Sequence, residues 1–418
     1  MNVIARIKNA SLYPLAYSIV ASQSVIARAK AFGKKPVVHF QKTYAGEKIL
    51  LIALYEKGRL RPDILNLLDT AKAAGLYVVA VNTLKVLQPE SLQDHIDCYI
   101  ERPNFGRDFG SYQTGFLHLF NQGWETQCPR LLMVNDSLFY SKQNLAVFLE
   151  QMTNTDIEVL GATENYEEDY HLGSFCISVS GSILKNNIFK KYWTTYKKSD
   201  LGPKVIERGE KNLSKILFRC AIADSEIRTL FDVIWLSNIL RKKPKLIDTA
   251  LLLCRDSLHP WPQPTLKKIA GDVVDKFMFS DFALANIEAN IEANIEANKM
   301  FAVTNLDDLV KSLTSCCHIN TSNIADEVRE VARTNLLSTF KIGSQIHQNA
   351  ILLHSLGLPI VKLDTLYRGV LSVRDIEKIA MQLSEEERFG FLSLLHRRPF
   401  GGDTLVGWKK AAFNQGLI

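Results

Sequence analysis

A chain of 418 residues, 47% hydrophobic and 22% charged, is long enough for two or three domains and has the composition of an ordinary soluble globular protein. The net charge of +6 is small for this length and gives no indication of nucleic-acid binding, while the dispersed basic clusters suit anionic small molecules or an anionic membrane surface. The seven cysteines have no regular spacing and include no Cys-x-x-Cys pair, which argues against a disulfide framework or a zinc site of that kind and favours a reducing cytoplasm.

The first 45 residues are expected to form a helical arm. Apolar residues recur there at helical spacing, with Ser, Gln and Arg between them: Leu12, Leu15, Ala16, Ile19 and Ile26. Such a helix would pack on the protein or touch a membrane surface. No apolar run approaches the roughly 18 residues that a membrane-spanning helix needs, so we expect a soluble cytoplasmic protein that is at most peripheral to the membrane.

Strands and helices alternate between residues 46 and 265. Apolar runs predict strands at 48–54, 76–83, 95–102, 130–137, 157–163 and 173–180, and helical patterns occupy 61–74, 112–120, 144–152, 183–198, 204–220 and 231–240. The segment 247–254 is expected to be a short strand or a buried turn. This order predicts an α/β fold with a mainly parallel, Rossmann-like sheet flanked by helices.

A smaller second unit is predicted beyond this domain. Three prolines between Ser257 and Lys268 mark the clearest boundary in the chain, and a linker is expected over 266–300. Within the linker, residues 285–298 repeat the tetrad Ile-Glu-Ala-Asn, whose period of four favours a spacer helix without chemistry. Residues 301–418 have a mainly helical pattern.

Polar residues collect where the predicted strands end. They are Tyr55 and Glu56, the stretch from Asn104 to Ser111, the triplet Asn135, Asp136 and Ser137, and the acidic cluster Glu164, Glu167, Glu168 and Asp169. The carboxyl ends of parallel strands meet at one edge of a sheet, and ligands of such folds bind there. We therefore expect the binding site at this edge.

The stretch NFGRDFGSYQTG, residues 104–115, lies between a predicted strand and a predicted helix. Gly106 and Gly110 bracket Arg107 and Asp108, so the backbone can turn sharply and bring its N–H groups close to a ligand. The positive end of the following helix would favour a phosphate at the same place. The alternative is a structural turn that the Arg–Asp pair ties down, which is the commoner meaning of a short glycine motif on its own.

Two carboxylates are candidates for group-transfer chemistry. Transfer of a sugar from a nucleotide donor requires neutralisation of the diphosphate, and Asp136 could hold a divalent cation such as Mn²⁺ or Mg²⁺ for this purpose. Glu210, in a predicted helix, could deprotonate an acceptor hydroxyl as a general base. The alternatives are a capping role for Asp136, a solvated position for Glu210, and a base within the acidic cluster 164–169.

Several motifs in one order resemble the rhamnan synthesis protein F family: RPNFGRDFGSY, LLMVNDS, HLGSFC, GEKNLSKIL and the closing segment NAILLHSLGLPIVKLDTL, where Gly357, Pro359 and Lys362 match. The resemblance covers residues 48–366 and is weakest across the tetrad repeat. It implies a bacterial glycosyltransferase of the GT-A type with a nucleotide-sugar donor, rhamnose being common in the family's context. The acceptor would be lipid-linked or a growing polysaccharide, such as lipopolysaccharide O-antigen or capsule, at the cytoplasmic face of the inner membrane.

The resemblance and the strand-end positions together give the predicted site. Catalytic roles are expected for Glu210 and for Asp136, which would also be the metal ligand. The expected nucleotide-sugar ligands are Tyr55, Asn104, Gly106, Arg107, Asp108, Ser111, Asn135, Ser137 and His171.

This chain departs from the family pattern at two points. The usual Asp-x-Asp metal motif is replaced by Asn135, Asp136 and Ser137, and Gly173 follows His171–Leu172 where a longer polar side chain is common. A degenerate transferase that binds sugar or scaffolds a polysaccharide-assembly complex is therefore an alternative function. A nucleotide-dependent phosphotransferase is disfavoured, because the sequence contains no phosphate-binding Gly-x-x-x-x-Gly-Lys-Ser/Thr segment.

Overall fold

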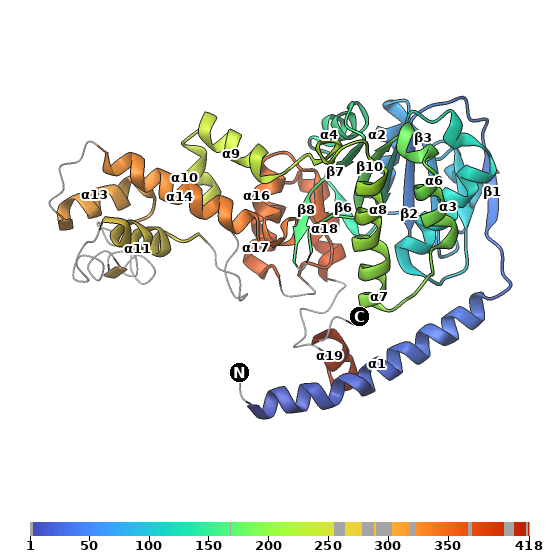
Figure 1. Cartoon of the computed structure of the whole chain (residues 1–418), viewed down its shortest axis with the longest axis horizontal. Coiled ribbons are helices and arrows are strands. Elements are labelled where there is room, and N and C mark those ends of the chain that lie inside the picture. Colours follow the sequence, from blue (N-terminus) through green and yellow to red (C-terminus); the bar gives the residue numbers. More distant parts are fainter. Residues whose placement is uncertain are drawn as a thin grey trace.

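The computed structural model describes residues 3–167, 169–254, 264–277, 288–289, 303–317, 323–366, 370–396, 405–414 and 417. Their side chains are described from residue 13 onward, except those of residues 277, 316, 317 and 414. A long helix, α1 (Val3–Ala31), runs along one side of an α/β body, and a helical extension leads away from that body (Figure 1). The predicted N-terminal helix is therefore present, but it ends at Ala31, and Val37–Gln41, inside the predicted arm of residues 1–45, forms a strand of the central sheet instead.

Within the described residues, an eight-stranded sheet forms the centre of the body, in the order β1-β4-β3-β2-β5-β10-β7-β11. Its strands are β1 (Val37–Gln41), β2 (Ile49–Leu54), β3 (Tyr77–Asn82), β4 (Cys98–Glu101), β5 (Arg130–Asn135), β7 (Val159–Gly161), β10 (Cys176–Ser180) and β11 (Ile227–Thr229). The strands β4, β3, β2 and β5 are parallel, and β11 is parallel to β7, whereas β1 and β10 run antiparallel to their neighbours. The predicted α/β class with a mainly parallel sheet is confirmed. The edge strand β1 is not among the predicted strands, because its mostly exposed side chains do not form a long apolar run.

The other elements connect these strands and build the extension. The helices of the body are α2 (Pro62–Ala73), α3 (Arg107–Asn121), α4 (Leu145–Thr153), α5 (Gly181–Lys185), α6 (Asn187–Thr195), α7 (Gly202–Val205), the π-helical segment η3 (Ile206–Lys211) and α8 (Asn212–Cys220). Further helices are α9 (Val233–Lys242), α10 (Leu246–Leu252), α11 (Leu266–Phe277), α13 (Leu306–Cys317), α14 (Ile324–Phe340), α15 (Gln345–Gln348), α16 (Ala350–Ser355), α17 (Val373–Ala380), α18 (Glu385–His396) and α19 (Gly407–Asn414). Short 3₁₀ turns are η1 (Pro89–Leu92), η2 (Trp124–Thr126) and η4 (Asp224–Glu226). Short strands are β6 (Leu138–Tyr140), β8 (Glu164–Tyr166), β9 (His171–Leu172), β12 (Gly343–Ser344) and β13 (Ile360–Lys362).

Alternate residues of the central strand β2 supply two hydrophobic cores, one on each face of the sheet. Leu50 and Ile52 lie in the core shared with α2 and α4. Ile49 and Leu51 lie in the core shared with α3, α6 and α8. A strand that is buried on both faces needs apolar residues at every position, which explains the continuous apolar run of β2. The sheet is therefore covered on both faces, and its strand ends remain available for a site.

The C-terminal part is largely helical, as predicted, and it is joined to the α/β body. β13 pairs with β6, and β12 pairs with β8, so two strands of the C-terminal part extend elements of the body. Leu309, Leu336 and Leu353 lie in the same hydrophobic core as Leu50 and Ile52. Both strand pairing and core packing thus cross the boundary that the sequence predicts between the two units.

Most of the segment 247–254 is helical, because α10 runs to Leu252, rather than the expected strand or buried turn. Helix α10 buries Ile247 and Ala250, three positions apart, as one face of a helix does. Leu and Ala are strong helix formers, so this apolar run forms a helix that buries one of its faces next to α14. The predicted boundary over residues 255–263 and the Ile-Glu-Ala-Asn repeat, apart from Glu288 and Ala289, lie outside the described residues.

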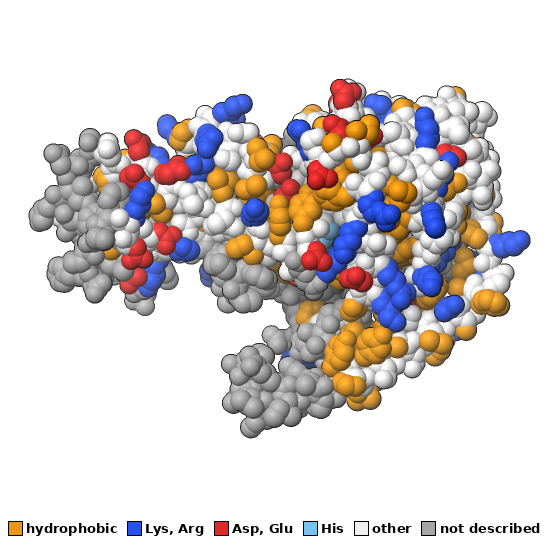
Figure 2. Space-filling view, in the orientation of Figure 1, with side chains coloured by type: hydrophobic (Ala, Val, Ile, Leu, Met, Phe, Trp, Pro, Cys, Tyr) orange, Lys and Arg blue, Asp and Glu red, His pale blue; other side chains and the backbone are white. Residues whose placement is uncertain are grey.

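None of the helices that the structure describes has both the length and the apolarity needed to cross a membrane. Hydrophobic side chains do gather along the outer side of α1, with Lys and Arg side chains beside them (Figure 2). This surface is separate from the two cores that cover the sheet.

Candidate functional site

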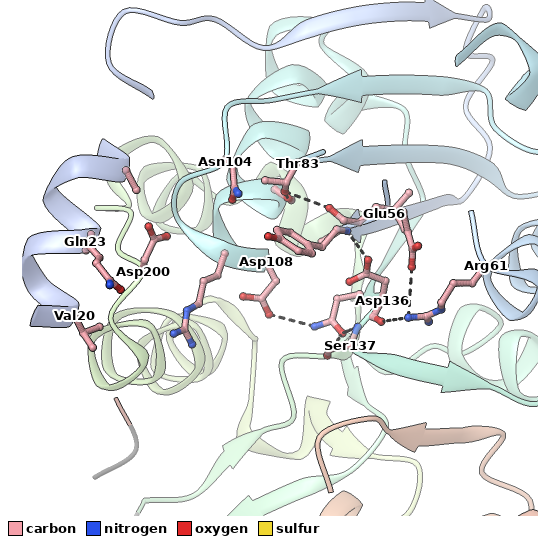
Figure 3. A pocket seen from close by; sticks show the side chains of 18 residues that line it. Val20, Gln23, Glu56, Arg61, Thr83, Asn104, Asp108, Asp136, Ser137 and Asp200 are labelled. Atoms are coloured by element: carbon pink, nitrogen blue, oxygen red, sulfur yellow. Dashed lines mark hydrogen bonds and ion pairs between the residues drawn. The ribbon is translucent and has the colours of Figure 1, made fainter. Parts of the chain in front are cut away.

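A pocket of about 750 Å³ opens at the carboxyl ends of β2, β3 and β5. Its walls come from the residues that follow these strands, from the first turn of α3 and from the inner side of α1 (Figure 3). Polar groups therefore surround the pocket at the edge of the sheet where the sequence predicts the ligand.

The backbone between β4 and α3 is held by one buried cation, Arg102. Its guanidinium donates hydrogen bonds to Ser111 Oγ at 2.8 Å, to the Phe105 carbonyl at 2.7 Å and to the Arg107 carbonyl. Burial lowers the pKa of Arg102 to about 10. This residue fixes the path of the loop, and it is not among the residues predicted from the sequence because it precedes the glycine motif.

Helix α3 begins at Arg107, five residues earlier than predicted. Gly106 has a φ of 100° and forms the left-handed residue before the helix, where a side chain would be strained. Arg107 and Asp108 therefore lie in the first helical turn instead of on a flexible corner. The positive end of α3 is directed to the pocket as expected, because residues of this first turn line it.

Two backbone N–H groups that the sequence predicts to face a ligand are bonded within the protein. Gly106 N–H donates to Asp200 Oδ1 at 2.6 Å, and Phe109 N–H donates to Asp108 Oδ1 at 3.0 Å. Asp200 comes from the turn before α7, far along the chain, so local sequence could not indicate this bond. Carboxylates of the protein therefore accept these two N–H groups, so a phosphate at the start of α3 would have to use other donors.

Asn135, at the end of β5, organises the floor of the pocket. Its side-chain amide donates to Asp108 Oδ2 at 3.2 Å, and its carbonyl oxygen accepts from Ser137 Oγ at 2.6 Å. Asn135 is only 1% exposed. It therefore positions Asp108 and Ser137, and all three residues line the pocket (Figure 3).

Asp136 and Glu56 face each other across an arginine, Arg61. Asp136 Oδ2 accepts the Tyr55 N–H, and burial with the nearby charge of Asp108 raises the pKa of Asp136 to about 6. Burial raises the pKa of Glu56 to about 7, although Arg61 opposes this shift. Arg61 donates to the Asp136 carbonyl at 2.9 Å and lies 3.4 Å from Glu56 Oε1. Both Glu56 and Arg61 line the pocket. Glu56 was expected at this edge of the sheet but was given no role in the site, and Arg61 was not predicted.

Arg61 is itself held by a bidentate contact. Its Nε and Nη2 each donate to a carboxylate oxygen of Asp63 at 3.1 Å. Such a planar pair fixes the guanidinium in one orientation. Arg61 immediately precedes Pro62, the first residue of α2. In the sequence this position indicates only the start of a helix, so a role of Arg61 in the site could not be predicted.

Glu210 and His171 form a second charged cluster beside the pocket. His171 Nε2 lies 3.7 Å from Glu210 Oε2, and His171 Nδ1–H donates to the Asp169 carbonyl at 2.8 Å. Burial alone would lower the pKa of His171, but the interactions with the Glu210 carboxylate and the Asp169 carbonyl together outweigh it and the pKa is raised. Burial alone would raise the pKa of Glu210, but His171 and Lys362 outweigh it and the pKa is lowered. Glu210 is therefore held as a carboxylate.

Lys362 connects this cluster to the pocket. The residue lies on β13, and its Nζ donates to Ser137 Oγ at 3.2 Å and stands 5.3 Å from the centre of the Phe175 ring. Its charge lowers the pKa of Glu210 and opposes the rise that burial and Glu210 impose on the pKa of Asp108. Lys362 was not predicted as a site residue. Its match to the closing segment of the family was the one feature of the sequence that could have indicated a role in the site.

Most of the predicted nucleotide-sugar ligands come together in this pocket. The lining residues among them are Tyr55, Asn104, Arg107, Asp108, Ser111, Asn135 and Ser137, and Asp136 lines it as well. Gly106 shapes the start of α3, and His171 and Glu210 form the adjacent cluster. In the competing acidic cluster, Glu164 accepts a hydrogen bond from Tyr166 OH at 2.8 Å, and Glu168 lies outside the described residues.

Within the described chain, no group of three or more His, Cys, Asp or Glu side chains is arranged to hold a metal ion. Four carboxylates line the pocket, those of Glu56, Asp108, Asp136 and Asp200, and Asp108 is close enough to Asp136 for its charge to raise the pKa of Asp136. Asp108 and Asp136 form the pair considered for a cation. Mg²⁺ commonly binds through one or two carboxylates together with phosphates of the substrate. This pair therefore fits a cation that arrives with a phosphorylated ligand.

The central part of the site lies within one family segment. Residues 76–229 match the rhamnan synthesis protein F family. The rhamnan synthesis protein F segment contains Asp108, Asp136, His171 and Glu210, whereas Tyr55 and Lys362 lie outside it. The resemblance expected from the sequence is confirmed, and it supports a glycosyltransferase-like role in polysaccharide synthesis.

Individual relatives add little about this role. The uncharacterized protein y4gN of Sinorhizobium fredii (strain NBRC 101917 / NGR234) is 27% identical over 167 residues, which cover 38% of this chain and 41% of y4gN. The chain thus spans about two fifths of the length of this relative. Two structures of the glycosyltransferase GlyE of Streptococcus pneumoniae TIGR4 each have a TM-score of 0.26. One is 12% identical and covers 47% of this chain and 50% of GlyE, and the apo form is 10% identical and covers 48% and 50%. Similarity of this degree does not establish a shared fold.

Proposed function

We propose that this protein is a GT-A-like glycosyltransferase of the hexosyltransferase type. It would move a sugar, with rhamnose as the first candidate, from a nucleotide-sugar donor to a lipid-linked or growing polysaccharide, such as lipopolysaccharide O-antigen or capsule. The observation that carries the proposal is one pocket, at the strand ends of a rhamnan synthesis protein F segment, that brings Asp108 and Asp136 next to the Glu210 cluster. A volume of about 750 Å³ lies within the usual range of small-molecule sites.

The donor would lie between the strand ends and the first turn of α3. Arg107 provides a cation for the diphosphate, and the positive end of α3 adds to it. Tyr55 is exposed at the rim, where its ring can stack on the nucleotide base. Asn104 and Ser111 supply hydrogen-bonding groups for the ribose or the sugar.

A divalent cation would be held by Asp136 and Asp108. The charge of Asp108 already contributes to the raised pKa of Asp136, and an arriving cation removes this repulsion. When bound, the cation neutralises the negative charge of the leaving diphosphate. With a pKa of about 6, Asp136 is ionised at neutral pH and available as its ligand.

Glu210 would act as the base towards the acceptor. Its carboxylate takes the proton of an acceptor hydroxyl while the oxygen bonds to the anomeric carbon of the donor sugar. The bond from that carbon to the diphosphate oxygen breaks, and the nucleoside diphosphate leaves. His171 and Lys362 keep Glu210 ionised, so it is ready to accept a proton over the neutral pH range.

Release of nucleoside diphosphate from a panel of nucleotide sugars tests the proposal. The purified protein is incubated with each donor, with and without Mg²⁺ or Mn²⁺, and the expected result is hydrolysis or transfer with one donor that stops in the Glu210→Gln variant. Binding of nucleoside diphosphate without turnover of any donor would favour the alternative, a sugar-binding or scaffold protein of a polysaccharide-assembly complex.

A further inference from the structure

The outer face of α1 carries an apolar surface that the site does not use. Leu15, Val25 and Ile26 are 54%, 65% and 53% exposed, and Phe32, just after the helix, is 86% exposed. Leu15 and Ile26 are eleven positions apart, about three helical turns, so they share one face of α1. Large apolar side chains gathered on one face mark a surface that contacts a partner or a membrane.

The opposite face of α1 is already occupied. Ala16 and Val20 are buried against Leu201 and against Ala411 and Ala412 of α19. Further along the helix, residues of the same inner side line the pocket. Among the residues that the structure describes, the outer apolar face is therefore left exposed rather than covered by packing within the chain.

Charge identifies the kind of partner. Residues 1–46 contain seven of the 50 Lys and Arg residues of the chain and none of its 44 Asp and Glu residues, so the remainder of the chain is net −1. Arg28 and Lys30 are exposed on α1 on either side of the apolar face, and Lys34 and Lys35 follow the helix. Basic side chains beside an exposed apolar stripe suit a surface that is anionic outside and apolar inside, which is a bilayer with anionic lipids.

We infer that α1 docks this protein on an anionic membrane surface through the face that contains Leu15, Val25 and Ile26. The apolar side chains enter the boundary of the headgroups, and the Lys and Arg side chains beside them meet the lipid phosphates. Because the inner face of the same helix lines the pocket, the pocket lies within about 10 Å of the bilayer, the diameter of one helix. The docking surface stands independently of the transferase proposal, whereas its use for reaching a lipid-linked acceptor rests on that proposal.

Co-sedimentation of the full chain with vesicles tests this inference. The vesicles contain either phosphatidylcholine alone or an equimolar mixture of phosphatidylcholine and phosphatidylglycerol. The protein should partition to the anionic vesicles, and added salt should weaken the binding. The double variant Val25→Glu, Ile26→Glu should lose about tenfold or more of its partition coefficient.

A matched control lies on α9. Ile234 is 66% exposed, close to the 65% of Val25, and it also lies on a helix, so Ile234→Glu should bind vesicles like the unaltered protein. The variant Arg28→Gln, Lys30→Gln tests the contribution of charge without placing a carboxylate on the face that enters the bilayer. It should weaken binding to the anionic vesicles and leave the behaviour with phosphatidylcholine vesicles unchanged. Equal loss in the Ile234 variant, or no binding of the unaltered protein, would overturn the inference.

Two further measurements distinguish membrane docking from dimerisation and show whether the double variant keeps the pocket intact. If the face instead joins two copies of the chain, light scattering will show a dimer that the double variant abolishes while vesicle binding is absent, and the membrane assignment is then wrong. Calorimetric titration with a nucleoside diphosphate should give the same affinity in the double variant, because Val25 and Ile26 do not line the pocket. Failure of the transferase proposal would appear in donor turnover and would leave the vesicle result unchanged.

Discussion

Asp136 carries the most informative single charge in the pocket. Its carboxylate accepts the Tyr55 N–H and points to the region where a donor diphosphate would lie. Asp136→Asn keeps the shape and an acceptor oxygen but removes the charge that would hold a cation. We expect turnover of the matching nucleotide sugar to fall by roughly a hundredfold. Release of nucleoside diphosphate measures it, and unchanged turnover would contradict the catalytic role.

The same substitution should leave the fold equally stable or more stable. The pKa of Asp136 is raised from 3.8 to about 6, so its charged form opposes folding as the pH rises through that value. The Asn variant should therefore unfold at the same or a higher temperature at pH 8. Below about pH 4 the carboxyl group is protonated in both states, and the difference should vanish. Thermal unfolding at the two pH values provides the check.

Lys362 tests whether the C-terminal part serves the site. Lys362→Met keeps an apolar stem over Phe175 but removes the cation that lowers the pKa of Glu210 and restrains that of Asp108. The acid limb of the pH profile of kcat should therefore move to higher pH, on the order of one unit, with lower turnover at neutral pH. Lys311→Met, on the exposed surface of α13, serves as the control and should leave the profile in place. A profile that does not move would mean that Lys362 has no electrostatic role.

At the scale of elements, the start of α3 depends on a glycine. Gly106 has a φ of 100°, and a Cβ there would come within 2.9 Å of Lys198 Cβ. Gly123 also has a positive φ, 70°, but a Cβ there would meet nothing within 4 Å. Gly123→Ala should lower the free energy of unfolding by about 1 kcal/mol, and Gly106→Ala should lower it further and weaken binding of nucleoside diphosphate. Urea unfolding and calorimetric titration measure the two effects, and equal behaviour of both variants would show that the contact with Lys198 is unimportant.

The contact between His171 of β9 and Glu210 of the π-helical segment η3 should make the stability of the protein depend on pH. The raised pKa of His171 contributes stability that is present below its ordinary value of 6.5 and is lost as the pH rises through its folded value. The lowered pKa of Glu210 contributes stability that is present above 4.5 and is lost as the pH falls through its folded value. His171→Gln should therefore cost most stability between about pH 4.5 and 6.5, as denaturant unfolding across this range would show. A cost that is equal at pH 5 and pH 9 would contradict the ion pair.

For the whole molecule, the shared core predicts that the body cannot fold without the C-terminal part. A chain ending at Lys341 lacks β12 and β13 and removes Leu352, Leu353 and Ile360 from the core that contains Leu50. We expect this chain to be insoluble or to lack a cooperative unfolding transition. A chain ending at His396 removes α19 and the small cluster on α1, and it should remain folded with a lower unfolding midpoint. A well-folded short chain would show that the body is an independent domain.

The sequence by itself determined the α/β class and the edge of the sheet where the pocket opens. Both follow from local pattern: β2 is apolar at every position because both of its faces are buried, and polar residues come directly after β2 and β5. Tyr55, Asp108, Asn135 and Asp136 were predicted correctly to lie together, because the carboxyl ends of parallel strands share one edge.

Only the tertiary structure decided which charges act together. Arg102 fixes the start of α3, Asp200 takes an N–H that a phosphate was expected to use, and Lys362 reaches Ser137 across 225 positions of the chain. These contacts depend on how distant segments pack, and no local spacing encodes such packing. The segment that carries Glu210 shows the same limit, because the sequence predicts an ordinary helix over 204–220, whereas η3 is π-helical and brings Glu210 to 3.7 Å from His171 of β9.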